Sequence, residues 1–143
     1  VASSACQDCI AGTYSARGAS SCLPCAPGEF GNSSGNRLSL CSACPVGFYS
    51  AIPGQTECSS CAEGKGGDPS AWTTMEENAG SLFLLYGATS EDACSCAVGW
   101  RQVADGSCKE CEEGLVCAGL ERITVKPGYF SVATPISVFQ CFA

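Results

Sequence analysis

The sequence predicts a small disulfide-rich fold: an elongated rod of tandem cysteine-rich repeats, made mostly of short β-hairpins and loops, with little or no helix. Cysteine makes up 14 of the 143 residues, a proportion typical of a disulfide scaffold. Leu, Ile, Val and Phe together make up only 26 residues. Because that is few for the core of a domain of this length, we expect crosslinks to offset the entropy lost on folding. A glycine also follows a cysteine by three positions six times along the chain.

The composition excludes several classes of function. The chain has no histidine, which excludes Ser-His, Cys-His and histidine–metal mechanisms within it. Its net charge of −7 leaves no basic face for nucleic acid. The longest apolar run is far too short to span a bilayer, so we expect no membrane span in this segment. Val1 is no initiator methionine, no signal-peptide pattern follows it, and Cys6 lies close to the start. We therefore expect a piece of a longer protein rather than a processed mature chain.

Residues 1–64 are expected to hold the tandem repeats, three full units and the start of a fourth. We call the cysteine of each Cys-x-x-Gly motif the opening cysteine, and the cysteine that ends the unit the closing cysteine. The six motifs along the chain are Cys9–Gly12, Cys25–Gly28, Cys44–Gly47, Cys61–Gly64, Cys96–Gly99 and Cys111–Gly114. The glycine permits a turn with positive φ, after which the chain forms a hairpin that the closing cysteine locks. Such a disulfide closes a loop of about 15 residues and stabilises by roughly 3 kcal/mol.

Aromatic residues follow the first three glycines by two positions: Tyr14, Phe30 and Tyr49. Each is expected to start a brief strand, lie over the disulfide and provide most of the apolar burial of its unit. Because each unit then contacts mainly its neighbours, the array is expected to be rod-shaped.

Residues 65–93 form a cysteine-free insertion. The segments 71–75 and 81–86 flank Glu76-Glu-Asn-Ala-Gly80, which predicts a β-hairpin with a five-residue loop. The apolar run of this insertion is expected to form a small local core against Trp72 and Met75. Alternatively, it is a docking strand for a partner, with a candidate interface of Leu82, Phe83, Leu84, Leu85 and Tyr86.

Residues 94–117 carry a tighter, closing cysteine group, and residues 118–143 form a β-rich tail. In the tail we expect two or three strands, at Arg122–Lys126, Tyr129–Val132 and Ser137–Phe142, punctuated by Pro127-Gly128 and Pro135.

One stretch of the repeats carries a family resemblance. Cys41-Ser-Ala-Cys44-Pro-Val-Gly47-Phe-Tyr49-Ser, followed by Gly54 and Cys58-Ser-Ser-Cys61, resembles the ephrin-receptor-like cysteine-rich repeat. That family is similar to the cysteine-rich domains of tumour-necrosis-factor receptors and to EGF modules, and Cys94 to Cys108 resembles the closing hairpin of an EGF-like module. The resemblance implies an extracellular, non-catalytic, multidomain protein and transfers no catalytic residue and no cofactor.

Two disulfide patterns fit the cysteines, and sequence alone does not decide between them. The sequential pattern joins each opening cysteine to the next closing one: Cys9–Cys22, Cys25–Cys41, Cys44–Cys58, Cys61–Cys94, Cys96–Cys108 and Cys111–Cys117, with Cys6 and Cys141 left for external disulfides. The crossed pattern gives Cys6–Cys22, Cys9–Cys25, Cys41–Cys58, Cys44–Cys61, Cys94–Cys108, Cys96–Cys111 and Cys117–Cys141. We favour the sequential pattern, because the turn follows the second cysteine of each doublet, which should then anchor its own hairpin.

Rival chemistries fit the sequence less well. Two doublets, Cys6–Cys9 and Cys22–Cys25, are too closely spaced for a usual four-thiolate zinc site, and no helix or βαβ pattern supports a redox Cys-x-x-Cys pair. Calcium prefers carboxylate ligands, but no calcium-loop motif is present, so we expect the acidic residues to be solvated loop charge. They are Glu76, Glu77, Glu91, Asp92, Glu110, Glu112 and Glu113. Paired carboxylates for glycoside hydrolysis would need a cleft that a narrow rod lacks. Asn32-Ser-Ser is an N-glycosylation sequon.

The sequence therefore predicts a non-catalytic extracellular structural or adhesion segment, a disulfide-stapled spacer of a larger surface or matrix protein. Its partners would be other protein chains or neighbouring domains of the same protein. One alternative is an accessory subunit docked on a membrane protein complex from its lumenal or extracellular side. Another is a receptor-type ligand-binding ectodomain. Oxidised cysteines place it outside the cell, at the cell surface or in another oxidising lumen.

Overall fold

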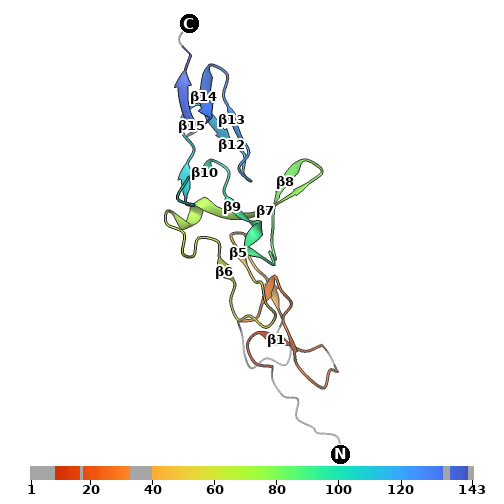
Figure 1. Ribbon diagram of the computed structural model, residues 1–143. Helices are drawn as coiled ribbons and strands as arrows, with labels where there is room; N and C mark the ends of the chain where they lie inside the picture. Colours follow the sequence, from red (N-terminus) through yellow and green to blue (C-terminus); the bar gives the residue numbers. More distant parts are fainter. Residues whose placement is uncertain (1–8, 17, 33–39, 134–135, 142–143) are drawn as a thin grey trace, which may run out of the picture.

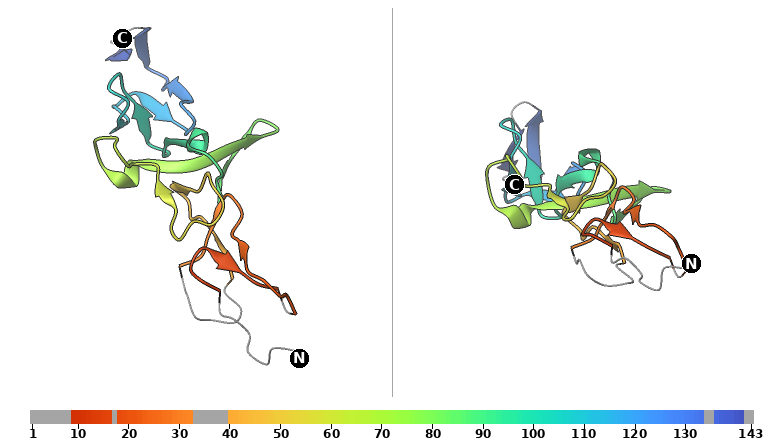
Figure 2. Two further views of the ribbon diagram at one scale, coloured as in Figure 1. Left: turned by 60° about the horizontal axis from the view of Figure 1, so that its bottom comes forward. Right: turned by 90° about the horizontal axis from the view of Figure 1, so that it is seen from below.

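The computed structural model describes residues 9–16, 18–32, 40–133 and 136–141. Over these residues the chain forms an elongated series of small antiparallel sheets, with β1 (Thr13–Tyr14) towards one end and β14 (Tyr129–Ala133) and β15 (Ile136–Gln140) at the other (Figure 1). Viewed from below, the elements overlap and the outline of the molecule is shorter, as expected for an elongated shape (Figure 2, right). The predicted fold class is confirmed, because the helical residues in the described part are confined to two 3₁₀ turns, Pro69–Ala71 and Glu91–Ala93.

The repeats at the start of the chain form three two-stranded hairpins. In each, the first strand follows the glycine of a Cys-x-x-Gly motif, and the second ends directly before the next opening cysteine. The pairs are β1 with β2 (Leu23–Pro24), β3 (Glu29–Phe30) with β4 (Ser42–Ala43), and β5 (Phe48–Tyr49) with β6 (Ser59–Ser60). Each strand has only two residues, so little of the stability can come from the sheets themselves.

The insertion forms a hairpin, as predicted, but the prediction of a five-residue loop was wrong. Strand β7 (Trp72–Asn78) reaches further than expected and pairs with β8 (Ser81–Leu84) across the two residues Ala79 and Gly80. Both have positive φ, 51° and 82°, which is the backbone that a tight two-residue hairpin turn requires.

Strand β7 also pairs with a strand beyond the insertion, which the sequence did not predict. Its first half lies antiparallel to β9 (Cys94–Cys96), with Trp72 opposite Cys96 and Thr74 opposite Cys94. The resulting sheet has the order β8-β7-β9. The insertion is therefore joined through its backbone to the closing cysteine group.

The last part of the chain forms three more hairpins. They pair β10 (Trp100–Gln102) with β11 (Cys108–Glu110), β12 (Leu115–Cys117) with β13 (Ile123–Val125), and β14 with β15. Strands β13, β14 and β15 lie within one to two residues of the three predicted tail strands, apart from the predicted end at Phe142, which lies outside the described residues.

Buried sulfur replaces a large apolar core. The opening cysteines of the first four units, Cys9, Cys25, Cys44 and Cys61, are at most 2% exposed, whereas Tyr14, Phe30 and Tyr49 are only half-buried. That the aromatic residues provide most of the apolar burial of each unit stays a prediction, because relative exposure does not give the area that each side chain buries. The main cluster lies where the insertion meets the closing cysteine group and comprises Cys61, Ala71, Trp72, Cys96 and Cys108.

Candidate functional site

Six disulfides connect the units in the described part of the chain. They are Cys9–Cys22, Cys25–Cys41, Cys44–Cys58, Cys61–Cys94, Cys96–Cys108 and Cys111–Cys117, with Cα–Cα distances of 5.6 to 6.2 Å. These are the pairs of the sequential pattern, and none belongs to the crossed pattern. Each opening cysteine is thus bonded to a cysteine further along the chain, 6 to 33 positions away.

Backbone hydrogen bonds join each unit to the next. The N–H of Cys25 donates to the carbonyl of Gly12, that of Cys44 to Gly28, and that of Cys61 to Gly47, at 2.8 to 2.9 Å. The same bond recurs after the insertion, from Cys111 to Gly99. Since the donor opens the next unit and the acceptor is the turn glycine of the unit before, the bond fixes the step between neighbours.

Two turn glycines lie against backbone two units away. A Cβ on Gly12 would lie 2.2 Å from the carbonyl oxygen of Gly54, and one on Gly28 would lie 2.3 Å from that of Gly87. Gly54 and Gly87 in turn donate N–H bonds to the carbonyls of Cys25 and Cys44. The φ values of Gly12 and Gly28, +83° and +84°, also favour glycine. At Gly12 and Gly28, glycine is thus required by packing as well as by the turn.

Thr74 anchors the insertion to the third repeat. Its side chain is fully buried, accepts a hydrogen bond from the N–H of Gly47 at 3.1 Å and donates one to the carbonyl of Leu85 at 2.6 Å. The N–H of Ser50 donates to the carbonyl of Ala88 nearby. A buried hydroxyl with both roles filled locks the two segments together. Sequence reasoning did not single out Thr74, because its partners lie far from it along the chain.

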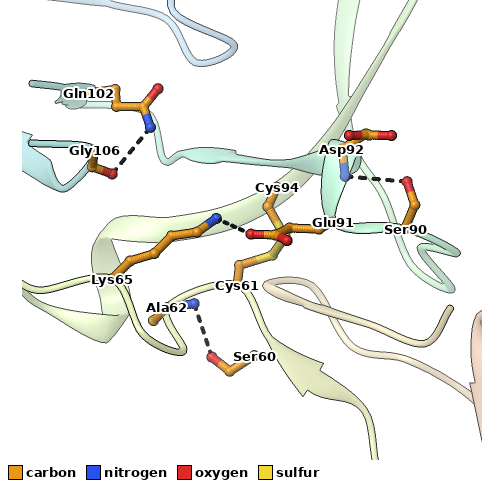
Figure 3. Close-up of polar contacts among 10 residues, drawn as sticks. All are labelled: Ser60, Cys61, Ala62, Lys65, Ser90, Glu91, Asp92, Cys94, Gln102 and Gly106. Atoms are coloured by element: carbon orange, nitrogen blue, oxygen red, sulfur yellow. Dashed lines mark hydrogen bonds and ion pairs between the residues drawn. A yellow bond between two sulfur atoms is a disulfide. The ribbon is translucent and has the colours of Figure 1, made fainter. Parts of the chain in front are cut away.

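Ion pairs account for several acidic residues that were expected to be solvated loop charge. Lys65 pairs with Glu91 at 2.7 Å, beside the Cys61–Cys94 disulfide (Figure 3), and its ammonium lies 4.5 Å from the centre of the Trp72 ring. Arg101 pairs with Glu112 at 2.6 Å. Both carboxylates remain exposed, as expected for solvated loop charge, and each also lies opposite a cation from another part of the chain.

Other polar contacts stabilise exposed turns. Asp68 and Asp105 accept hydrogen bonds from the hydroxyls and backbone N–H groups of Ser70 and Ser107, which hold the pKa of both carboxyls below the usual value. Tyr129 donates its hydroxyl proton to Glu113 at 3.1 Å, and this bond raises the pKa of the phenol.

The predicted local core of the insertion was wrong. Phe83, Leu84 and Tyr86 are 51%, 56% and 66% exposed, while Leu82 and Leu85 are partly buried. We call residues 76–86 the arm, and Figure 1 shows its hairpin projecting from the side of the molecule. Arg122 holds the arm by an ion pair with Glu77 and a hydrogen bond to the carbonyl of Gly80. Strand β8 is the edge of its sheet, so one side of it has no strand partner among the described residues.

The remaining predicted positions lie at the surface or outside the described residues. Cys141 is exposed, and it is the free cysteine in the described part of the chain. Cys6 lies outside the described residues. Asn32 is exposed, and the rest of its sequon, at 33–34, lies outside them as well.

The described residues assemble no metal cluster. No group of three or more Cys, Asp or Glu side chains among them could hold a metal ion. A hollow of about 250 Å³ is lined by Lys65, Trp72, Gln102, Glu121 and others, but both of its cysteines, Cys94 and Cys96, are in disulfides. Within the described ranges, no helix has the length and apolar character needed to cross a membrane.

Comparison with known proteins supports the receptor-like character of the repeats. Residues 31–77 match the family model described as tyrosine-protein kinase ephrin type A/B receptor-like. Together with the six disulfides, this match fits an ephrin-receptor-like cysteine-rich module, which is a non-catalytic, receptor-type domain. The searches of curated proteins and of solved structures found no match.

Proposed function

We propose that this chain is a non-catalytic spacer of a larger surface or matrix protein, which holds bound or neighbouring domains at a fixed separation. The observation that carries the proposal is the repeated bond from an opening cysteine to the glycine of the preceding unit, as from Cys44 to Gly28. Each unit is closed by its own disulfide and fixed to its neighbour, so rigidity is built up along the chain without a large core.

The proposed location is outside the cell or in another oxidising lumen. Disulfides persist there and are rare where glutathione and thioredoxin keep thiols reduced. The family match supports the same location. A glycan on Asn32 is part of this proposal, because the residue is exposed and the secretory route carries the glycosylating enzyme. Mass spectrometry of the Asn32 peptide from native material tests it, and a bare peptide in all molecules would remove this part.

Small-angle X-ray scattering of the oxidised protein tests the spacer. A compact chain of this length has a radius of gyration of about 14.5 Å. The spacer predicts a clearly larger value and an elongated scattering profile. A matched sample treated with a thiol reductant should lose that profile, because the small hairpins lack the apolar burial to persist alone. A compact particle, or an elongated profile unchanged by complete reduction, would contradict the proposal.

The exposed arm favours a second candidate, an accessory subunit docked on a membrane protein complex. Phe83, Leu84 and Tyr86 would then be covered by another chain. Hydroxyl-radical footprinting compares the native material with the purified protein. Docking predicts that these three side chains are protected only in the native material, while Ile52, which is 59% exposed, reacts equally in both. Equal reactivity of the arm in both samples would eliminate this candidate.

A further inference from the structure

The C-terminal hairpin repeats the turn of the earlier units without the cysteine. The N–H of Tyr129 donates to the carbonyl of Lys126 at 3.1 Å, as that of Phe48 donates to Pro45 at the same distance. The φ of Gly128 is +87°, equal to that of Gly47. Val125 stands three positions before Gly128, where the other motifs have their opening cysteine. The Cys-x-x-Gly pattern does not include this seventh turn for that reason.

The strand register also matches the earlier units. Tyr129 pairs with Gln140 and Phe130 with Phe139, as Phe48 pairs with Ser60 and Tyr49 with Ser59. The N–H of Cys141 donates to the carbonyl of Gly128 at 2.8 Å, as the N–H of Cys61 does to Gly47. Cys141 therefore occupies the position of an opening cysteine. Val138 stands three residues before it, at the position of a closing cysteine.

In the first three units this position is covered by the unit that follows. The N–H groups of Gly12, Gly28 and Gly47 donate to Gly31, Ser50 and the Thr74 hydroxyl, each in the next unit. The N–H of Gly128 has no acceptor among the described residues, and no atom of them lies within 4 Å of where its Cβ would be.

An exposed aromatic pair lies on the same hairpin. The rings of Phe130 and Phe139 stack at 5.2 Å and are 50% and 47% exposed. The end of the seventh unit thus leaves open the backbone position that the following unit covers in the first three units, with an exposed aromatic pair on the same hairpin.

We propose that this end, formed by Gly128, Phe130, Phe139 and Cys141, docks another cysteine-rich repeat, supplied by the polypeptide that follows Ala143. The occupant continues the contact by which unit follows unit in the described chain. Its closing cysteine forms a disulfide with Cys141: two thiols lose two electrons and two protons, which a disulfide oxidant of the secretory lumen takes up as it becomes a dithiol. The inference rests on the proposed oxidising location.

Peptide mapping of the full-length native protein, with free thiols alkylated before digestion and no reduction, tests this inference. The Cys141 peptide should be crosslinked to a peptide of the same polypeptide from beyond Ala143, through the first cysteine of a Cys-x-x-Cys doublet. An alkylated Cys141 thiol, a mixed disulfide with a small thiol, or a link to Cys6 of a second copy would overturn it. If the six internal disulfides remain in those cases, the proposed function survives; if they are reduced as well, both fail.

A matched pair of variants tests the contact surface. Gly128→Ala and Gly106→Ala both place a side chain at positive φ, +87° and +83°, where the described residues leave open space. The strain within the unit is therefore the same. A docked repeat predicts that Gly128→Ala lowers the fraction of Cys141 in its disulfide, because a Cβ at the equivalent Gly47 would lie 3.4 Å from the carbonyl oxygen of Trp72 in the unit that follows. Equal crosslinking in both variants would contradict the proposed docking.

Discussion

Two of the turn glycines, Gly12 and Gly28, each meet two separate requirements. Gly12 needs a positive φ, which any L-residue adopts at a cost, and it needs the absence of a Cβ, because the carbonyl of Gly54 occupies that space. Gly18 has a φ of +81°, close to that of Gly12, but a Cβ on Gly18 would lie in open space. The motif predicted the first requirement. The second depends on a unit far along the chain and has no local sequence signal.

Gly12→Ala should therefore destabilise the protein more than Gly18→Ala. Both variants carry a left-handed backbone cost of roughly 1–2 kcal/mol. Gly12→Ala adds overpacking of about 1–3 kcal/mol against fixed backbone. The free energy of unfolding of the oxidised protein, measured with denaturant, checks the difference. Equal losses in the two variants would mean that the first and third units do not pack closely.

Thr74→Val should weaken the attachment of the insertion. The change keeps the shape of the side chain but leaves the N–H of Gly47 and the carbonyl of Leu85 without their hydroxyl partner. A buried polar group left unpaired costs about 1–3 kcal/mol. Thr73→Val is the matched control, because Thr73 is also buried and its hydroxyl makes no hydrogen bond among the described residues. Thermal unfolding of the two variants should differ, and coincident curves would contradict the anchor.

At the scale of elements, the hairpins were predictable and their long-range pairings were not. The turn motifs and the short apolar segments between turn residues are local signals. They predicted the repeat hairpins and the tail strands. The pairing of β7 with β9 joins Trp72 to Cys96 across the whole insertion. The arm was misjudged because its apolar run lies on an edge strand, and the side chains of Phe83 and Leu84 stay exposed there.

The disulfide that closes the insertion should contribute more than the shortest one. The Cys61–Cys94 pair spans 33 positions and Cys111–Cys117 spans 6. The loop-entropy model gives about 3.7 and about 2.2 kcal/mol for loops of those sizes. Replacing both cysteines of a pair by serine should therefore cost about 1.5 kcal/mol more at Cys61 and Cys94, measured as the free energy of unfolding. A larger loss from the Cys111 and Cys117 variant would show that the short loop, and not the insertion, limits stability.

At the scale of the molecule, the elongated disulfide-rich fold followed from composition, since few large apolar residues and many cysteines leave little alternative to serial small hairpins. The division into 1–64, 65–93, 94–117 and 118–143 stays a prediction. The β7–β9 pairing crosses one of those boundaries, and the repeat geometry reappears within the tail, at Gly128.

Disulfide mapping of the unreduced, native protein tests the account most directly. Proteolysis without reduction, followed by mass spectrometry, should recover Cys9 linked to Cys22, Cys25 to Cys41 and Cys44 to Cys58, because each opening cysteine closes its own hairpin. The insertion pair Cys61–Cys94 should be recovered intact as well. Peptides linking Cys9 to Cys25 or Cys44 to Cys61, or thiols found reduced or bound to metal, would contradict the serial hairpins and the rod built from them.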